Sequence, residues 1–190
     1  MSYSMDKYQI PFVKTFEYTK IIGVENINFG KYIIIDDFVL IYAKEQINIG
    51  NHVHIASFVS ISGGGQLNLG AFSGIASGCR IITGTDDFKD WGFGNPTIAN
   101  EFRNVKTNPI SIGQFCVVGA NSVILPGVSI GDGATVAAGS VVSKTLEPWG
   151  IYVGNRKIAD RDKDAVLNNY RNFRTQNEID QVGSLFKNNT

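Results

Sequence analysis

Large apolar side chains recur along this chain at intervals of six residues. The interval holds without a break from Ile112 to Val142, and shorter runs begin at Phe29, Ile49 and Leu69. The positions that follow the rule are Phe29, Ile35, Ile41, Ile49, Ile55, Ile61, Leu69, Ile75, Ile81, Ile112, Val118, Ile124, Ile130, Val136 and Val142. An α-helix would scatter these positions around its surface, so the pattern predicts short strands joined by tight corners.

Small residues follow many of these apolar positions, as three-sided coils require. Glycine comes directly after the apolar residue at Gly30, Gly50, Gly70 and Gly113, and it accounts for 21 of the 190 residues. That share is well above the usual value of about 7%. If three hexapeptides close one coil, the large side chain fills the centre and glycine gives the corner its backbone freedom. A β-sandwich is the alternative, but it would alternate with a period of two.

Three departures from the rule predict where the coils are interrupted. Steps of eight residues, from Ile41 to Ile49 and from Ile61 to Leu69, predict bulged turns at one corner of successive coils. Residues 86–111 form a far longer insertion, and its aromatic residues are Phe88, Trp91, Phe93 and Phe102. A solvated linker carries fewer aromatic residues, so we expect an ordered arm that covers a site or packs on a neighbouring subunit. Near the N-terminus, Ile10, Phe16 and Ile22 are also six apart. Residues 1–21 are therefore expected to form a cap or an irregular first coil.

The tail of the chain, residues 160–190, loses the six-residue rhythm. Apolar residues fall there at helical spacing, at Val166, Tyr170 and Phe173 and again at Ile179, Val182 and Phe186. One or two amphipathic helices are predicted, and we expect them to cap the strand edges that a solenoid exposes at its end. With the coils assigned to residues 22–159, the whole chain is expected to be a single domain.

Composition excludes several classes of partner. The 17 basic and 17 acidic residues balance, so nothing favours binding to nucleic acid or to an anionic membrane. The sequence has no apolar stretch long enough for a membrane span, and we expect a cytoplasmic protein. His52 and His54 would share one face of a strand, as metal ligands sometimes do. They are the only two histidines, and no metal site is expected.

The segments IGNHVHIASFVSI and IGQFCVVGANSVILPGVSIGDGATVAAGSVVSK resemble the hexapeptide-repeat acyltransferases. The resemblance covers about residues 22–161. It implies an all-β fold, a left-handed parallel β-helix with the inserted loop 86–111 and a helical C-terminal segment. Roughly five or six coils are expected, stacked at the usual strand spacing of about 4.8 Å. The resemblance also implies a homotrimer, with acetyl-CoA bound in the groove between two prisms.

The start of the insertion indicates the acceptor. Family members that acetylate sugar hydroxyls carry TGH there, with the histidine as general base, whereas this chain reads TGTDDF with Thr85 at that position. A neutral amine needs less help from a base than a hydroxyl does. The segments GTDDF, NPTIANEFRNV and LEPWGIYVGN resemble the subgroup that N-acylates nucleotide-linked 4-amino-4,6-dideoxy sugars. The implied reaction is acetyl transfer to dTDP-4-amino-4,6-dideoxy-D-glucose for surface polysaccharide synthesis. A sugar or antibiotic O-acetyltransferase and a non-catalytic scaffold stay open as alternatives.

The same resemblance suggests site residues, each with a structural alternative. Asp86 and Asp87 are the catalytic candidates, although either could form an Asx turn. His54 is a further catalytic candidate, because it precedes Ile55 at a corner-facing position from which it could reach a cleft between subunits. The acceptor pocket would contain Thr85, Glu101, Arg103 and Asn104, although Glu101 and Arg103 could form an ordinary ion pair of the arm. CoA is expected along Gly119, Ala137 and Ala138, with its phosphates near Lys144, Arg156, Lys157 and Arg161, whose alternative is a solvated surface.

Overall fold

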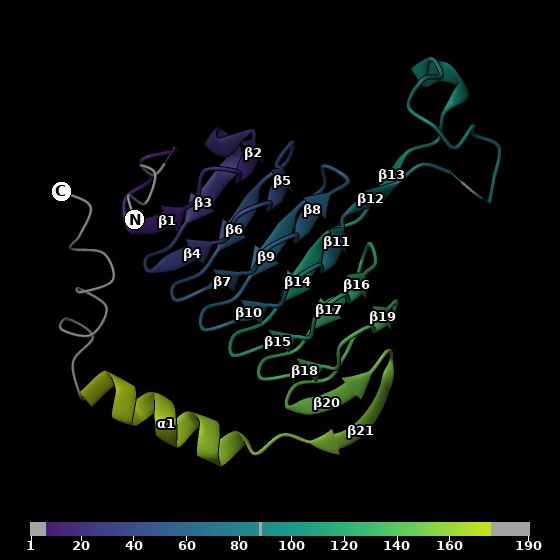
Figure 1. Cartoon of the computed structure of the whole chain (residues 1–190). Helices are drawn as coiled ribbons and strands as arrows, with labels where there is room; N and C mark the ends of the chain where they lie inside the picture. The colour runs from purple at the N-terminus through teal and green to yellow at the C-terminus, as the bar shows by residue number, and fades with distance from the viewer. Residues whose placement is uncertain (1–6, 88, 176–190) are drawn as a thin grey trace.

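The computed structural model describes residues 7–87 and 89–175, which form a parallel β-helix with three faces (Figure 1). Face A consists of β1 (Val13–Thr15), β4 (Ile33–Ile35), β7 (His54–Ile55), β10 (Gly74–Ile75), β15 (Val117–Val118), β18 (Thr135–Val136) and β20 (Gly150–Val153), with β21 (Arg156–Asp160) antiparallel at its end. Face B consists of β2 (Lys20–Ile22), β5 (Leu40–Tyr42), β8 (Ser60–Ser62), β11 (Arg80–Ile82), β16 (Val123–Ile124) and β19 (Val141–Val142). Face C consists of β3 (Ile27–Phe29), β6 (Ile47–Ile49), β9 (Leu67–Leu69), β14 (Ile110–Ile112) and β17 (Ser129–Ile130).

The six-residue register predicted from the sequence is confirmed. Fourteen of the fifteen positions have relative exposures between 0 and 3%, and only Phe29 is half-buried. Parallel pairing stacks equivalent residues of successive coils, so that Ile35 lies beside Ile55 and Ile55 beside Ile75. Each fully buried isoleucine contributes roughly 1.5–3 kcal/mol of transfer free energy. The seven parallel strands of face A mark seven coils, more than the number expected from the sequence.

The first coil is regular, but its register differs from the prediction by one residue. Thr15 and Ile21 are buried and pair with Ile35 and Ile41 of the second coil. Ile22 is 43% exposed instead. Ile10 is partly buried and packs against the core, and Phe16 is half-buried, so these three residues do not form one inward row. An interval of six is also kept by residues that point outward, and only pairing with the next coil decides which set faces inward.

Every departure from the hexapeptide rule in the first four coils occurs at the edge between faces B and C, which we call edge BC. The first coil places the 3-10 turn η1 (Val24–Asn26) there, and the second and third coils have the bulged turns at residues 43–46 and 63–66, as predicted. Gly63 has a φ of 97°, and a Cβ on it would clash with the backbone of Gly84. The fourth coil inserts the long arm between β11 and β14 at the same edge.

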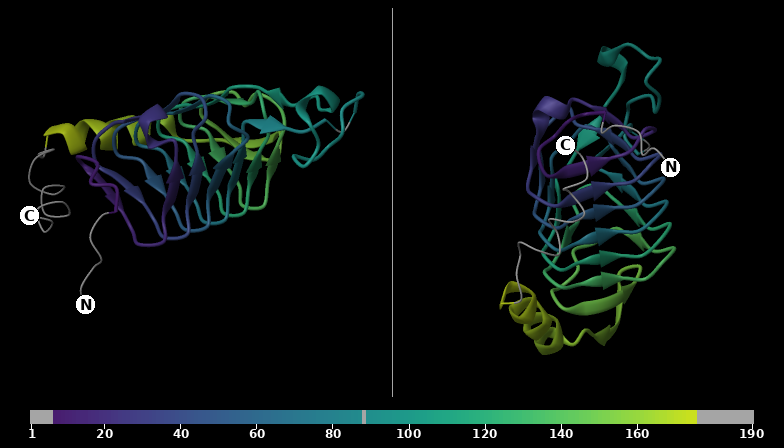
Figure 2. Two further views of the ribbon diagram at one scale, coloured as in Figure 1. Left: turned by 90° about the horizontal axis from the view of Figure 1, so that it is seen from above. Right: turned by 60° about the vertical axis from the view of Figure 1, so that its left-hand side comes forward.

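The arm leaves the prism as a two-stranded hairpin. β12 (Gly84–Thr85) pairs antiparallel with β13 (Lys106–Thr107), and η2 (Asn100–Phe102) lies toward the far end. Figures 1 and 2 show the arm projecting away from the coils of its own chain. Trp91, Phe93 and Phe102 are 55–66% exposed on it. Their apolar surface is therefore available to something other than this prism.

The C-terminal helix α1 (Lys163–Thr175) contains the predicted helical residues Val166, Tyr170 and Phe173. The sequence predicted that this helix would cap the end of the solenoid, and that prediction was wrong. The helix lies along the edge between faces C and A, which we call edge CA (Figure 2). The open strand edge of the last coil is covered by β21 instead, because a hairpin strand can satisfy the backbone groups that a helix cannot reach. The predicted second helix at Ile179, Val182 and Phe186 lies outside the described residues.

Aromatic side chains form a row along edge CA, and α1 packs against them. The rings follow the order Phe12, Tyr32, His52, Phe72 and Phe115, with Trp149 beyond a gap at Gly133. Tyr170 meets the rings of Phe72 and Phe115 edge-on, at centroid distances of 5.1 and 5.2 Å. Across residues 7–87 and 89–175, no helix combines the length and apolar character that crossing a membrane requires.

Candidate functional site

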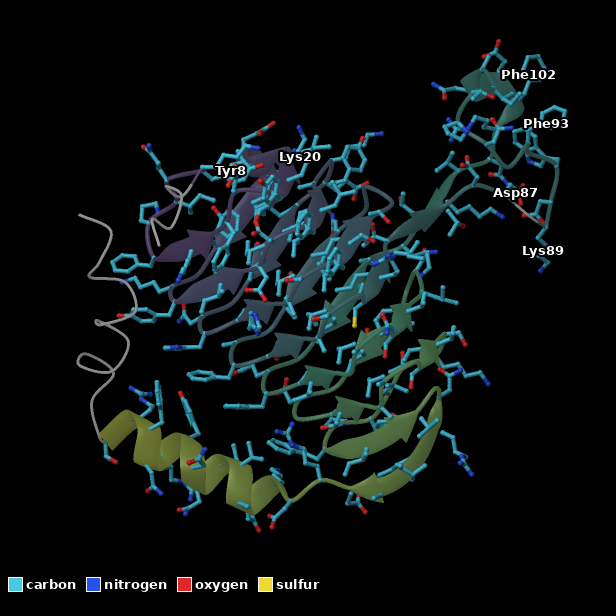
Figure 3. All side chains as sticks on the ribbon, in the orientation of Figure 1. Tyr8, Lys20, Asp87, Lys89, Phe93 and Phe102 are labelled. Carbon is cyan, nitrogen blue, oxygen red and sulfur yellow. The ribbon has the colours of Figure 1, made fainter. Side chains whose placement is uncertain are left out.

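The base of the arm brings together residues that are far apart in the sequence. Asp86 and Asp87 follow β12, whereas Arg103 and Asn104 precede β13, so the hairpin places the two pairs side by side. The guanidinium of Arg103 donates to Asp86 Oδ1 from Nε at 3.1 Å and from Nη2 at 2.5 Å. Asn104 Nδ2 donates to Asp87 Oδ2 at 2.9 Å. Figure 3 labels Asp87 among the arm residues.

Asp87 is a structural centre of the arm. Its carboxylate accepts hydrogen bonds from the backbone N–H groups of Lys89, Asp90 and Gly92 in addition to the bond from Asn104. The bonds from Asp90 and Lys89, followed by those from Asn104 and Gly92, hold the pKa of this carboxyl far below its usual range. This geometry matches the Asx-turn alternative, and a carboxylate so strongly stabilised is a weak base at neutral pH.

Asp86 has a different environment. Both bonds from Arg103 go to Oδ1, which leaves Oδ2 as an acceptor that this ion pair does not use. The side chains of Arg103 and Asp86 are 16% and 26% exposed, so the pair is partly shielded from solvent. Arg103 therefore pairs with Asp86, and the alternative ion pair with Glu101 is not formed. Glu101 lies exposed in η2, toward the far end of the arm, and takes part in none of the ion pairs among the described residues.

A pocket of about 310 Å³ lies between the arm base and the next coils. It is lined by Thr85, Asp86, Asp87, Lys89, Lys106, Asn108, Leu125, Pro126 and Ser143. The sequence reasoning did not find Leu125, Pro126 or Ser143, because they keep the hexapeptide rule and only coil stacking brings them beneath the arm. Lys106 forms an ion pair with Asp90, and this hydrogen bond raises the pKa of Lys106.

The two histidines do not share a strand face, contrary to the prediction. His52 occupies a corner with φ 57° and stacks between Tyr32 and Phe72 at centroid distances of 4.8 and 4.6 Å. His54 lies on β7 of face A rather than at a corner, and its Nε2 is 3.0 Å from Asp36 Oδ2. Face A lies opposite edge BC in a three-sided prism, so His54 is remote from the arm base of its own chain.

The CoA candidates Gly119, Ala137 and Ala138 lie together at the edge between faces A and B, which we call edge AB. Gly119 and Ala137 follow β15 and β18 in successive coils. A Cβ on Gly119 would lie 2.5 Å from Ala138 N and 2.7 Å from Val136 O. The coils are therefore stacked so closely there that glycine is required by packing alone.

The cationic candidates separate into structural and exposed groups. Arg161 donates from Nη1 to the carbonyl oxygens of Phe115 at 2.5 Å and Gly133 at 3.0 Å, which ties the chain leading to α1 onto the coils. Lys157 pairs with Asp160 on β21. Lys144, which follows β19, and Arg156 at the start of β21 are exposed.

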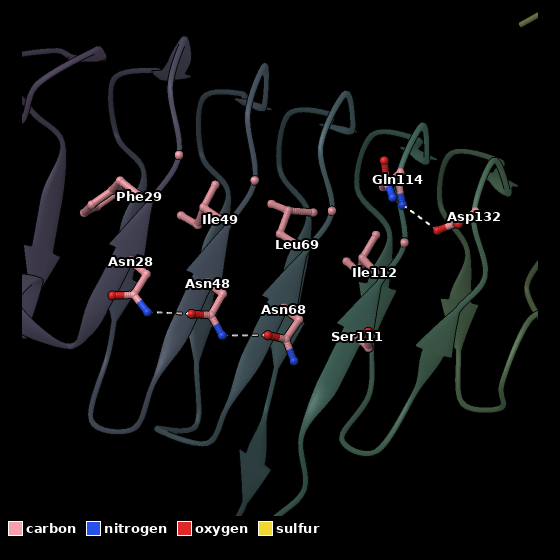
Figure 4. Close-up of a pocket in the computed structure, with 14 residues that line it drawn as sticks. Asn28, Phe29, Asn48, Ile49, Asn68, Leu69, Ser111, Ile112, Gln114 and Asp132 are labelled. Carbon is pink, nitrogen blue, oxygen red and sulfur yellow. Dashed lines mark hydrogen bonds between the residues drawn. The ribbon is translucent and has the colours of Figure 1, made fainter. Parts of the chain in front are cut away.

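A second, shallow pocket of about 440 Å³ lies over face C (Figure 4). Its floor carries an amide ladder, in which Asn28 Nδ2 donates to Asn48 Oδ1 at 2.9 Å and Asn48 Nδ2 donates to Asn68 Oδ1 at 2.7 Å. These amides satisfy one another along the stacked coils, so the ladder stabilises the face. Among the described residues, no group of three or more His, Cys, Asp or Glu side chains is placed to hold a metal ion.

Comparison with known proteins identifies the family. The dTDP-4-amino-4,6-dideoxy-D-glucose acyltransferase of Escherichia coli is 30% identical over 154 residues, which cover 80% of each protein. The chain belongs to the hexapeptide-repeat acyltransferases. The family model described as the hexapeptide repeat of succinyl-transferase matches residues 109–144 of this hexapeptide-repeat acyltransferase.

Solved structures resemble this hexapeptide-repeat acyltransferase over most of its length. A variant of AntD, an N-acyltransferase from Bacillus cereus, was solved in complex with dTDP-4-amino-4,6-dideoxyglucose and coenzyme A. It is 32% identical with a TM-score of 0.80, and the match covers 87% of this chain and 89% of AntD. AntD was also solved with dTDP and 3-hydroxybutyryl-CoA, at a TM-score of 0.78. The expected fold is thus confirmed, and the AntD complexes agree with the CoA donor predicted from the sequence.

Other relatives of this hexapeptide-repeat acyltransferase match a shorter stretch. A Staphylococcus aureus protein whose name states only the acetyltransferase class is 41% identical over 68 residues, which cover 33% of this chain. The chain spans 34% of the length of that relative. Such a match supports the coil architecture and carries no information about the acceptor.

Proposed function

We propose that this protein transfers an acetyl group, or a related short acyl group, from acyl-CoA to the 4-amino group of dTDP-4-amino-4,6-dideoxyglucose. The E. coli relative and AntD, which match this chain over most of its length, support this choice of substrate. The AntD complex with 3-hydroxybutyryl-CoA supports a donor range that extends beyond acetyl. The product would be the corresponding amide and free CoA.

The observation that carries the proposal is that the described residues lining the arm-base pocket include no histidine or other uncharged general base. Its carboxylates are Asp87, whose pKa is held far below the usual range, and Asp86, which is paired with Arg103. A sugar hydroxyl needs a positioned base to become a nucleophile, a contribution on the order of 10²–10⁴ in rate. An amine in its neutral form already has the lone pair that attacks a thioester.

The proposed reaction needs no further reagent. The amine nitrogen attacks the thioester carbonyl carbon, the new C–N bond forms and the C–S bond then breaks. The departing thiolate takes the surplus proton from nitrogen, which leaves an amide and the CoA thiol. A thiolate whose conjugate thiol has a pKa of about 8.5 readily accepts a proton from such a strongly acidic nitrogen.

We assign the acceptor contacts to the arm base. Thr85 and Asp86 face the pocket, and Asp86 Oδ2 would accept a hydrogen bond from the amine and orient it. Asp87, with Arg103 and Asn104, would position this constellation. Glu101, at the arm end, is proposed as a contact to acceptor held on a neighbouring subunit. CoA would follow edge AB at Gly119, Ala137 and Ala138, with phosphates near Lys144, Arg156 and Lys157.

A homotrimer is part of the proposal, because the arm projects from its own prism with exposed Trp91, Phe93 and Phe102. His54 is the second candidate for the proton acceptor, and Asp36 would orient its imidazole. Since His54 lies on face A, it would act on an arm supplied by another subunit. In that case His54→Gln would lower kcat/KM by on the order of 10²–10⁴, and an unchanged kcat/KM would exclude this role.

The proposed location is the cytoplasm, where acyl-CoA and nucleotide sugars occur, and the proposed pathway is surface polysaccharide synthesis. Cys79 and Cys116 are both free thiols, which agrees with a reducing compartment.

The test is acyl transfer by the purified full-length chain. Acetyl-CoA and 3-hydroxybutyryl-CoA are incubated with dTDP-4-amino-4,6-dideoxyglucose, and thiol release and product mass are followed. The control acceptor is dTDP-glucose, which offers only hydroxyls. We expect amide formation with the amino sugar alone. Transfer only to hydroxyl acceptors would replace the proposal with O-acylation, and no transfer or CoA binding with any acceptor would favour a scaffold.

A further inference from the structure

Edge AB changes its chemical character halfway along the prism. The third corner residue of each successive coil is Tyr18, Phe38, Phe58, Gly78, Asn121 and Gly139. The first three present aromatic rings, and the fourth and sixth have no side chain. The small residues proposed to receive CoA belong to the second half of this edge, so the aromatic half has no assigned role.

The three rings form one exposed stack. The ring of Tyr18 lies 5.2 Å from that of Phe38, which lies 5.1 Å from that of Phe58, and both pairs are within 3° of parallel. Tyr18 and Phe58, at the two ends, are each 57% exposed. Phe38 lies between them, so the free face of the Phe58 ring points toward the fourth coil, where Gly78 adds no further ring to the stack.

The corner of the fourth coil stays in register with that of the third. Gly78 N–H donates to Ser57 O at 3.0 Å, so the two corners are one coil step apart. That step is about 4.8 Å, which is close to the observed ring spacing. A flat ring stacked on Phe58 would therefore lie at the level of Gly78. A Cβ on residue 78 would lie 2.1 Å from Asn121 Oδ1, so this side-chain oxygen reaches the level of Gly78 and could accept a hydrogen bond from the edge of such a ring.

A cation stands beside the open ring. Arg80 Nη1 is fixed by Phe58 O at 2.6 Å and Gly78 O at 3.1 Å, and Arg80 takes part in none of the ion pairs among the described residues. The preceding corner positions carry acids in the second coil, at Asp36 and Asp37, but Ala56 and Ser57 replace them in the third. The charge near Phe58 therefore favours an anion.

We propose that the free face of Phe58, together with Gly78, Asn121 and Arg80, binds the base and the adjoining phosphate of the nucleotide-linked acceptor. The inference rests on the proposed function and adds the nucleotide subsite to it. A planar heterocycle joined to a phosphate is the chemistry that this combination recognises, since stacking suits any base and a guanidinium suits a phosphate. The adenine of CoA has the same chemistry. We assign the subsite to the acceptor because CoA is proposed on the small-residue half of the edge.

The test is calorimetric titration of the full-length protein with dTDP and, separately, with CoA. Phe58→Ala should raise the Kd for dTDP on the order of 10- to 100-fold, and Phe58→Trp should retain wild-type binding. Tyr18→Ala is the matched control, because it removes an equally exposed ring from the other end of the stack and should leave both constants unchanged. Arg80→Gln should weaken dTDP binding and reduce its dependence on salt.

Three results would overturn the assignment. Phe58→Ala could bind dTDP as Tyr18→Ala does, it could weaken CoA in place of dTDP, or it could lower the mass of the assembly in light scattering, which would make the stack a subunit contact. Failure of the proposed function is distinguishable from these. In that case the wild-type protein itself would neither bind dTDP nor acylate the amino sugar, whereas failure of the subsite alone would leave wild-type turnover intact.

Discussion

Adding one methyl group at Gly119 separates two reasons for glycine on edge AB. If glycine is present only so that CoA can approach the backbone, Gly119→Ala should fold normally and bind CoA less tightly. The structure predicts a different result, because the new Cβ would lie 2.5–2.8 Å from three atoms of the next coil, Ala138 N, Val136 O and Ala137 C. These are backbone atoms of a stacked coil, so they cannot rotate out of the way.

The expected magnitude follows from the cost of overpacking, which is typically about 1–3 kcal/mol. For a chain of this size, about 1 kcal/mol shifts the melting temperature by roughly 2–4 °C. Gly74→Ala is the matched control, because Gly74 is also on the helix of coils and a Cβ there would meet nothing within 4 Å. Replacing glycine at such a site reduces the entropy of the unfolded chain, which stabilises by about 0.4–1 kcal/mol.

The assay is equilibrium unfolding in denaturant for both variants, with the protein concentration held constant. We expect Gly119→Ala to be less stable than wild type and Gly74→Ala to be equally or slightly more stable. Wild-type stability of Gly119→Ala combined with a weaker CoA affinity would refute the packing argument, and it would assign Gly119 to the cofactor groove alone.

Three further predictions follow from the arm, the thiols and α1. The pKa of Asp87 is depressed in the folded arm, so its ionised carboxylate stabilises the arm above about pH 4, and this contribution is lost as the pH falls toward the folded pKa. Asp87→Asn should therefore loosen the arm and increase quenching of Trp91 fluorescence at pH 7. The difference from wild type should shrink below about pH 4. Burial raises the pKa of Cys79 and raises that of Cys116 to about 11, so the folded protein should not react with thiol reagents at pH 8, and prompt labelling would contradict the buried placement. Tyr170→Ala removes two edge-on ring contacts and should loosen α1 by about 1–3 kcal/mol in hydrogen exchange, whereas Tyr170→Phe should not.

Sequence periodicity predicted the interior well because the coils impose it directly. Each buried isoleucine sits above another, so a single inward position repeats for as long as the coils do. The same reasoning misplaced the first coil, where Ile22 and Ile21 compete and only pairing with the second coil decides between them. Periodicity fixes the interval, whereas strand pairing fixes the phase.

The candidate site was less predictable, because its contacts depend on tertiary geometry. The resemblance placed Asp86, Asp87, Arg103 and Asn104 in one neighbourhood, and the hairpin does join them. It could not show that Asp87 is committed to backbone donors, since that depends on the conformation of the residues that follow. Nor could it separate Glu101 from the pocket, because the length of a hairpin is not determined by its residue types.

The two halves of the proposed site lie on different edges of the same prism. The arm base belongs to edge BC, whereas the proposed CoA path and the Phe58 stack belong to edge AB, and the whole width of face B separates them. A strand of three residues spans about 10 Å, and the interior between the edges is filled by the stacked core. An acceptor held at edge AB therefore meets an arm most directly when the arm comes from an adjacent copy. This geometry gives the proposed homotrimer a catalytic reason in addition to a structural one, and it predicts that variants which weaken assembly will lose kcat/KM even where both half-sites are unaltered.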